Sequence, residues 1–429
     1  MTLAAGIEPL LPAYLGRQRW FAGEAPSSAE VVTSEELADG LLWLLADAGG
    51  ALYQVVIGTR AADDQPDFLH GHDVQVLGVV DGQVAFDALL DPEYAKLVLA
   101  KVCPDLDAPS LMRPMGAEQS NSSLVFDDAF VLKVFRRLHD GPNPDVEITT
   151  ALAAAGFGHV AEPFGVWRQD NRDLAIAARY LAGGAEGWAL AQTSLRDLYA
   201  TGYDDPGACG GDFAAEATRL GTVTATMHLA LAEQFGAQPA DPAAWADALE
   251  AQLSRLAEGD ADPAAAKDFV ERLRAVGDAG PAIRVHGDYH LGQVMRTDTG
   301  WFVLDFEGEP VRPLEERRQP TSPMKDVGGM LRSFHYAAQV ALTERDEMEH
   351  DELLSPAVAW ERRNQGAFLA GYFGTEGIDA VLPGGTDQRD LVLASFELDK
   401  AVYEVLYERA YRPDLVHIPL GAIARLLRG

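Results

Sequence analysis

The pattern of hydrophobic and polar residues changes near residue 186. Before that point, short apolar runs of strand length alternate with turn residues such as Asp81-Gly82. Examples of these runs are 51–57, 74–80, 123–126, 130–135 and 173–181. One amphipathic helix is expected from Asp145 to Ala155, where Gly156 ends it. The pattern predicts a β-rich first part with few helices.

Beyond residue 186, apolar residues recur at the three- and four-residue spacing of amphipathic helices. The predicted helices are 211–234, 243–257, 264–276, 326–342, 356–371 and 387–411. Loops and short strands interrupt them around residues 286–307. The chain is therefore predicted to be an α+β protein with three parts, 1–95, 96–185 and 186–429.

Composition and charge narrow the class of protein. The 429 residues, 48% of them hydrophobic, are enough for two or three domains with proper cores. A formal net charge of −32 argues against nucleic acid or an anionic membrane as a partner. No apolar run approaches a membrane span, and the first residues do not resemble a secretory signal. With only Cys103 and Cys209, both expected in the core, a reduced cytoplasmic setting is expected.

The strongest chemical signal is His286-Gly287-Asp288-Tyr289-His290-Leu291-Gly292-Gln293, followed by Asp305-Phe306-Glu307. Phosphoryl transfer from a nucleoside triphosphate needs a carboxylate beside the attacking hydroxyl and oxygen ligands for Mg²⁺. Asp288 is the candidate base, and Gln293 and Asp305 are the candidate Mg²⁺ ligands. Glu307 is a third candidate contact to the metal, and His286 is expected to tie the loop to neighbouring backbone. The alternative is an ordinary aspartate-rich loop between helices.

Lys133 stands in the apolar strand 130–135, where it is expected to reach the phosphates of the nucleotide. Glu147, in the helix that follows, is its expected partner. The alternative is an edge-strand lysine that blunts an open sheet edge.

Two further segments are assigned to the nucleotide by their position in the chain. Small polar residues before the Lys133 strand can point amides and hydroxyls at phosphates, although serine and asparagine turns are common. These residues are Gln119, Ser120, Asn121, Ser122 and Ser123. A second segment falls where a kinase hinge would offer backbone groups to adenine, and it consists of Arg179, Tyr180 and Leu181.

The helix predicted at 387–411 carries a polar stripe at three- and four-residue spacing. The stripe includes Glu397, Lys400, Tyr403 and Glu404. It is either a solvated face with internal salt bridges or a sugar-binding wall, whose carboxylates would suit an amino sugar. His335, on the helix predicted at 326–342, is assigned to the same wall, or it is a partly buried helix residue.

At these motifs the chain resembles actinobacterial maltokinases, a branch of the aminoglycoside phosphotransferase-like kinases. The similarity begins near residue 15 and includes 17–23, 119–126, 131–137, 143–147, 186–188, 286–294, 305–310, 314–334 and 396–408. The resemblance implies a bilobal protein-kinase-like fold with an N-terminal cap at 1–95, a kinase N-lobe at 96–185 and a helical C-lobe at 186–429. It also implies ATP and Mg²⁺ as cofactors and a sugar hydroxyl as the phosphate acceptor.

Two residues depart from the maltokinase pattern, His335 in place of an acidic residue and Tyr289 in place of leucine. They favour the glucosamine kinase branch, which forms glucosamine 6-phosphate, over a maltokinase, which forms maltose 1-phosphate. An aminoglycoside phosphotransferase and a catalytically idle sensor are further alternatives. Both a monomer and a homodimer remain open.

Overall fold

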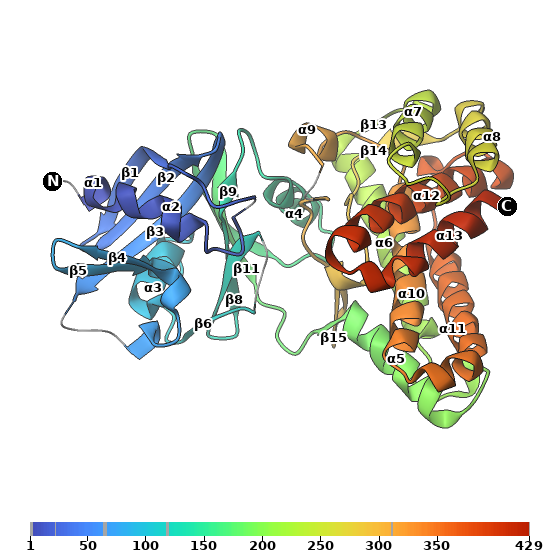
Figure 1. Ribbon diagram of the computed structural model, residues 1–429, viewed down its shortest axis with the longest axis horizontal. Helices are drawn as coiled ribbons and strands as arrows, with labels where there is room; N and C mark the ends of the chain where they lie inside the picture. Colours follow the sequence, from blue (N-terminus) through green and yellow to red (C-terminus); the bar gives the residue numbers. More distant parts are fainter. Residues whose placement is uncertain (1–2, 22, 63–66, 117–119, 310–311, 429) are drawn as a thin grey trace. The chain divides into compact units, whose positions relative to one another are not determined.

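The computed structural model describes residues 3–21, 23–62, 67–116, 120–309 and 312–428 (Figure 1). The chain forms two compact units, one of residues 1–150 and 161–182 and the other of residues 151–160 and 183–429. The last change of unit along the chain, after residue 182, lies close to the change of hydrophobic pattern near residue 186. The separation of 1–95 from 96–185 within the first unit stays a prediction.

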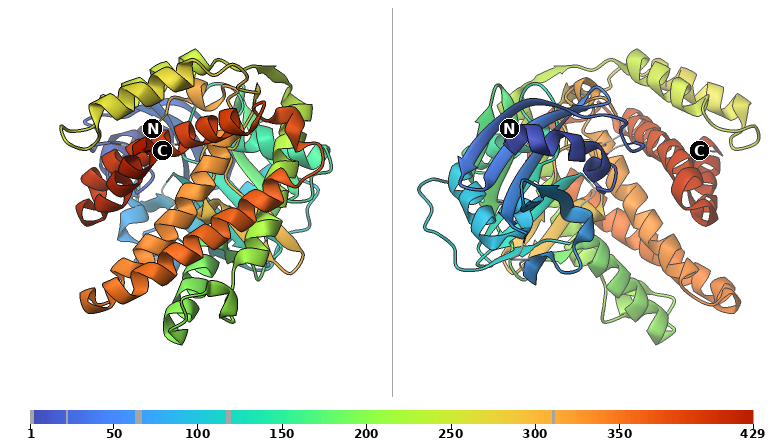
Figure 2. Two further views of the ribbon diagram at one scale, coloured as in Figure 1. Left: turned by 90° about the vertical axis from the view of Figure 1, so that its right-hand side faces the viewer. Right: turned by 60° about the vertical axis from the view of Figure 1, so that its left-hand side comes forward.

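The first unit begins with a twisted antiparallel sheet in the order β1-β2-β3-β5-β4, with β9 paired to β3. Its strands are β1 Glu30–Ala38, β2 Leu41–Ala48, β3 Ala51–Ala61, β4 Val76–Val80, β5 Gln83–Asp87 and β9 Arg137–Leu138. The short helices α1 (Leu3–Ile7) and α2 (Leu11–Leu15) cover one face, as the right-hand view of Figure 2 shows. Leu11 of α2 and Val55 of β3 belong to the apolar core between them.

The other face of that sheet shares a core with helix α3 (Pro92–Val102) and a second antiparallel sheet. Trp43 and Trp167, from the two sheets, meet in this core with ring centroids 5.6 Å apart. The second sheet runs β10-β11-β8-β7-β6. Its strands are β6 Met112–Pro114, β7 Asn121–Phe126, β8 Phe130–Phe135, β10 Pro163–Gln169 and β11 Arg172–Arg179. Helix α4 (Pro144–Ala154) follows β8, and the strand and helix predictions in this region are confirmed.

The second unit is mainly helical, and all six helices predicted for it are present. Its helices are α5 Gly187–Thr201, α6 Ala214–Phe235, α7 Pro242–Leu253, α8 Pro263–Arg274, α9 Leu314–Arg317, α10 Met324–Thr343, α11 Glu347–Phe373, α12 Thr386–Tyr411 and α13 His417–Arg428. Helix α11 begins nine residues before the predicted 356, because the polar segment ahead of Pro356 continues the helix through the proline. The sequence pattern did not identify α5, α9 and α13. Helix α10 packs against α5, α11 and α12, and α10 and α11 run side by side in Figures 1 and 2.

Short strands frame the loops that carry the predicted chemistry. They are β12 Ala185–Glu186, β13 Ala237–Pro239, β14 Pro281–Ile283, β15 Val294–Thr297 and β16 Gly300–Val303. The predicted catalytic loop lies between β14 and β15, and Asp305 follows β16 after one residue. The hairpin of β15 and β16 therefore brings Asp305 near the catalytic loop 286–293. Among the described residues, no helix has the length and apolar character needed to cross a membrane.

Candidate active site

The loop 286–293 is fastened to the start of helix α10 by one buried carboxylate. Asp326 accepts hydrogen bonds from the backbone N–H of His286 (2.8 Å) and of Gly287 (2.9 Å), and His228 Nε2 lies 3.0 Å from it. The Asp326 side chain is 0% exposed. Burial opposes ionisation, but hydrogen bonding and His228 outweigh it and lower the pKa of Asp326 below its ordinary value. Asp326 therefore fixes the backbone from which Asp288 projects.

His286 holds the other side of the loop, as the sequence predicted. Its Nε2 lies 2.8 Å from the carbonyl oxygen of Leu304, and the backbone N–H of Asp288 donates to its Nδ1 at 3.3 Å. Its ring packs on Phe306 at a centroid distance of 4.8 Å. These contacts tie the loop of Asp288 to the segment of Asp305.

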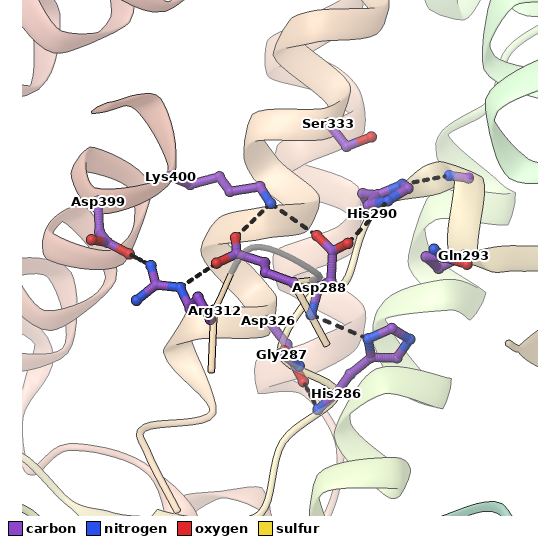
Figure 3. A network of polar contacts seen from close by, with 12 residues as sticks. His286, Gly287, Asp288, His290, Gln293, Arg312, Asp326, Ser333, Asp399 and Lys400 are labelled. Atoms are coloured by element: carbon purple, nitrogen blue, oxygen red, sulfur yellow. Dashed lines mark hydrogen bonds and ion pairs between the residues drawn. The ribbon is translucent and has the colours of Figure 1, made fainter. Parts of the chain in front are cut away.

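Asp288 makes an ion pair with a lysine from a distant helix (Figure 3). Lys400 of α12 places its Nζ 2.9 Å from Asp288 Oδ1 and 2.8 Å from Glu309 Oε1. Burial opposes the charge of Asp288, but the Lys400 ammonium outweighs it and lowers the pKa of Asp288 below its ordinary value. Likewise the two carboxylates outweigh burial and hold the pKa of Lys400 above its ordinary value. Both groups are therefore charged at neutral pH.

Glu309 is held in turn by Arg312, which also donates to Asp399 at 2.8 Å. A chain of charges results, in which Glu309 links Arg312 to Lys400. Its labelled members in Figure 3 are Asp399, Arg312, Lys400 and Asp288. No sequence motif indicated a role in this site for Glu309, Arg312 or Asp399. They come from two segments that only helix packing brings together, so no spacing along the chain identifies them.

The two predicted metal ligands are neighbours. Gln293 Nε2 lies 3.2 Å from Asp305 Oδ2, and the amide oxygen of Gln293 is then the atom that would bind a cation. Asp305 has a left-handed backbone with φ of 60°, a conformation that aspartate adopts more readily than most residues. Hard oxygen donors at this spacing fit Mg²⁺. Glu307 lies two residues further on, where its carbonyl accepts a hydrogen bond from Arg317.

Lys133, in the first unit, forms an ion pair with Asp145 of α4, with Nζ 2.9 Å from Oδ2. Both side chains are largely buried, at 16% and 11% exposure. The predicted partner, Glu147, lies two residues further along the same helix. The lysine is thus held by the expected helix through Asp145, and the pairing with Glu147 stays a prediction.

The predicted phosphate loop is mostly strand. Asn121, Ser122 and Ser123 begin β7, and Ser123 pairs across the sheet with Lys133. The Ser122 hydroxyl accepts a hydrogen bond from Arg136 (2.8 Å), and Asn121 donates to Ser120 (3.1 Å). Gln119 lies outside the described residues. A role for these residues at the phosphates stays a prediction.

The predicted hinge follows β11. Tyr180 N–H donates to the Ala129 carbonyl and Arg179 N–H to the Glu162 carbonyl, both at 2.8 Å. The predicted contact with adenine would therefore have to use the carbonyl groups of this segment or the amide of Leu181.

Helix α12 brings its polar stripe to the catalytic loop at one point. Lys400 meets Asp288 there and stacks over the ring of Tyr403, 4.8 Å from its centroid. Glu404, one turn on, forms an ion pair with Arg332 of α10. Glu397, one turn before Lys400, lies over Gly328 of α10, where an added Cβ would sit 3.4 Å from its Cγ. The stripe therefore contacts both α10 and the catalytic loop, and its role as a sugar-binding wall stays a prediction.

Tyr289 and His335, the two departures from the maltokinase pattern, are buried against neighbouring helices. Tyr289 is 2% exposed, and its hydroxyl lies 2.8 Å from that of Thr224 on α6. His335 is buried as well, with Nδ1 3.0 Å from Glu361 of α11. The ring of Tyr289 therefore completes the core beneath the catalytic loop. A role for His335 in acceptor binding stays a prediction.

The fold and this constellation together define a protein-kinase-like phosphotransferase. Residues 112–308 match the model of the phosphotransferase enzyme family, and residues 14–91 match the maltokinase N-terminal cap domain. The resemblance found in the sequence is thereby confirmed.

Two curated relatives are glucosamine kinases. The protein of Streptacidiphilus jiangxiensis is 31% identical over 72% of this chain and 72% of its own length. The protein of Mycolicibacterium smegmatis is 29% identical over 73% of this chain and 79% of its own length. A solved glucosamine kinase in complex with glucosamine, ADP and inorganic phosphate is 25% identical, with a TM-score of 0.69, and covers 98% of this chain and 99% of its own. This chain belongs to the phosphotransferase enzyme family, together with these glucosamine kinases, and carries a maltokinase-like N-terminal cap.

Proposed function

We propose that this protein transfers the γ-phosphoryl group of ATP to a hydroxyl group of glucosamine and forms glucosamine 6-phosphate. The observation that carries the proposal is the ionised Asp288, held in a rigid loop beside the oxygen donors of Gln293 and Asp305. The relatives supply the acceptor, since both are named glucosamine kinases. Because the nucleotide is ATP, we expect the protein in the cytoplasm.

Asp288 accepts a hydrogen bond from the acceptor hydroxyl and orients its oxygen toward the phosphorus atom. Its low pKa makes it a weak base, which suits a loose transition state in which the proton leaves late. The O–P bond to the sugar forms, the bond to ADP breaks with its electron pair on ADP, and the hydroxyl proton passes to Asp288.

Gln293 and Asp305, with Glu307 as a further contact, would hold Mg²⁺. The ion, when bound, neutralises charge on the nucleotide phosphates. Lys133, held by Asp145, is expected to contact the same phosphates, with Ser120 to Ser123 alongside and 179–181 at the adenine.

The amino group of glucosamine is expected to bind near Glu397. The charged groups that act on the Glu397 carboxyl are the carboxylates of Glu361 and Glu404 and the guanidinium groups of Arg332 and Arg425. With Glu397 ionised, three carboxylates face two guanidinium groups. Burial raises the pKa of Glu397 to about 7, so an added cation would favour its charged form. An ammonium group from the substrate is a cation of this kind.

The test is a coupled ADP-release assay with glucosamine, N-acetylglucosamine, glucose, maltose and an aminoglycoside as acceptors. We expect kcat/KM to be highest for glucosamine, by about tenfold or more over the two uncharged hexoses, as a charge-assisted contact provides. Glu397→Gln should remove most of this preference and leave turnover of glucose unchanged. Phosphorus NMR of the product identifies the hydroxyl. Preference for maltose, which the cap domain favours, or turnover of no sugar would overturn the proposal.

A further inference from the structure

We propose that Lys400 is a second catalytic residue, whose ammonium group contacts the transferring phosphoryl group while it remains bonded to Asp288. The inference rests on the proposed function only in taking Asp288 as the residue that receives the acceptor hydroxyl. It concerns the same reaction and adds a cation on the acceptor side of the phosphorus atom, distinct from Lys133 in the nucleotide-binding part.

The position of Lys400 is fixed by two carboxylates. Its Nζ is 2.9 Å from Asp288 and 2.8 Å from Glu309, and the Tyr403 ring centroid is 4.8 Å away. Among the described residues, two of its three N–H donors have a hydrogen-bond acceptor, so one can turn from the ring to a phosphoryl oxygen. Glu309 is only 3% exposed in its side chain and binds Arg312 through its other oxygen. The two carboxylates therefore hold the ammonium group in place beside Asp288 (Figure 3).

Distances in the reaction bring the phosphoryl group to this ammonium. The acceptor hydroxyl lies about 2.7 Å from the Asp288 carboxylate when it is hydrogen-bonded. The phosphorus atom lies roughly 3–3.5 Å from that hydroxyl at the start of the reaction. Asp288 Oδ1 already accepts from Nζ at 2.9 Å, so a hydroxyl bonded to the same oxygen lies about 4–5 Å from Nζ. A phosphoryl group on the Lys400 side of that hydroxyl then brings its oxygens within about 3–4 Å of Nζ. The remaining N–H of Lys400 is within reach of one of them.

The contact has a chemical purpose in this reaction. As the bond to ADP breaks and the bond to the sugar oxygen forms, negative charge is spread over the phosphoryl oxygens. A fixed cation placed there stabilises the transition state more than the ground state, which raises kcat. Lys400 stays protonated throughout, and the hydroxyl proton still passes to Asp288. A purely structural lysine would neutralise Asp288 and Glu309 and do no more.

Two substitutions separate these roles. Lys400→Gln keeps a hydrogen-bond donor and removes the charge, whereas Lys400→Arg keeps the charge. We expect Lys400→Gln to lower kcat by about 10²-fold or more, while the KM values for ATP and for the sugar change by less than about threefold. Lys400→Arg should retain at least about a tenth of the wild-type kcat. Lys267→Met, at an exposed lysine of α8, is the matched control and should leave kcat unchanged.

A second readout reports on the phosphoryl contact itself. Binding of ADP with Mg²⁺ and aluminium fluoride, which mimics the transferring group, should weaken in Lys400→Gln by about the factor lost in kcat, whereas binding of ADP alone should not change. If Lys400→Gln does not fold, the double variant with Glu309→Gln removes one buried carboxylate as well and serves instead. Unchanged kcat, unchanged affinity for the fluoride complex, or a loss confined to the KM of the sugar would overturn the assignment.

These measurements are independent of the acceptor proposed above. Wild-type turnover with glucosamine tests that proposal. The ratio of variant to wild type tests Lys400 and is measured with whichever acceptor supports turnover, or with water as the acceptor in ATP hydrolysis.

Discussion

Asp326 is the single side chain on which the geometry of the catalytic loop depends most. We expect Asp326→Ala to destabilise the second unit and to reduce kcat. The carboxylate accepts two backbone N–H groups, at 2.8 and 2.9 Å, and lies 3.0 Å from His228 Nε2. With the side chain at 0% exposure, water does not replace these bonds when the carboxylate is removed.

The size of the effect follows from these three contacts. A hydrogen bond to a charged group contributes about 1.5–3 kcal/mol, and contacts that share one acceptor are not additive. We therefore expect a loss of roughly 3–5 kcal/mol for Asp326→Ala, comparable to breaking a buried ion pair. Asp326→Asn keeps one acceptor oxygen and should lose about half as much. In a unit of this size, each kcal/mol lowers the melting temperature by roughly 2–4 °C.

Thermal melting followed by tryptophan fluorescence measures these shifts, and kcat at a temperature where each variant is folded measures the effect on the loop. Asp379→Ala provides the control, because its carboxylate is 86% exposed and its ion pair with Arg389 spans 3.4 Å. That variant should melt within about 2 °C of wild type, since exposed pairs contribute little. A melting temperature for Asp326→Ala equal to that of the control would refute the reasoning.

The same carboxylate predicts a pH dependence. Because its pKa is lower in the folded protein than in the unfolded chain, its contribution is present above the unfolded pKa of about 3.9 and is lost as pH falls through the folded value. The difference in melting temperature between wild type and Asp326→Asn should therefore be constant from pH 8 to 5 and shrink below about pH 4. A difference that stays constant down to pH 3 would contradict this account.

Three further predictions concern the loop and the helix packing. Asp288→Asn should lower kcat by about 10²–10⁴ with little change in melting temperature, measured by ADP release, and a loss under threefold would argue against its role. Tyr289→Phe removes the buried hydrogen bond with Thr224 and should lower the free energy of unfolding by about 1 kcal/mol, while kcat and acceptor preference stay unchanged. A changed acceptor preference would indicate that Tyr289 takes part in acceptor binding. Gly221→Ala should destabilise the protein by about 1–3 kcal/mol, because the added Cβ would lie 2.0 Å from the Phe368 carbonyl oxygen. Gly366→Ala, on an exposed helix surface, is the control and should stabilise the protein by up to about 1 kcal/mol. Equal melting temperatures for the two variants would count against a close contact between α6 and α11.

Local patterns in the sequence accounted for most of the secondary structure. The strands at 51–57 and 130–135 and the six predicted helices of the second unit were recognisable, because side-chain periodicity directly reflects which face of an element is buried. The start of α11 was misplaced for the same reason, since its first turns are polar and exposed and carry no such periodicity.

The class of chemistry was also readable from the sequence, because Asp288, Gln293 and Asp305 lie close together in the chain and their spacing is set by one loop and one hairpin. Tertiary structure decided what surrounds that aspartate. Lys400 is 112 residues from Asp288, Glu309 is 91 residues from Lys400, and Asp326 is 40 residues from His286. Such groups meet only because α10 and α12 pack together beside the loop, and neither residue type nor spacing records which faces of two helices will touch. Tyr289 is buried in the core formed by this packing, and no local sequence pattern predicts its burial.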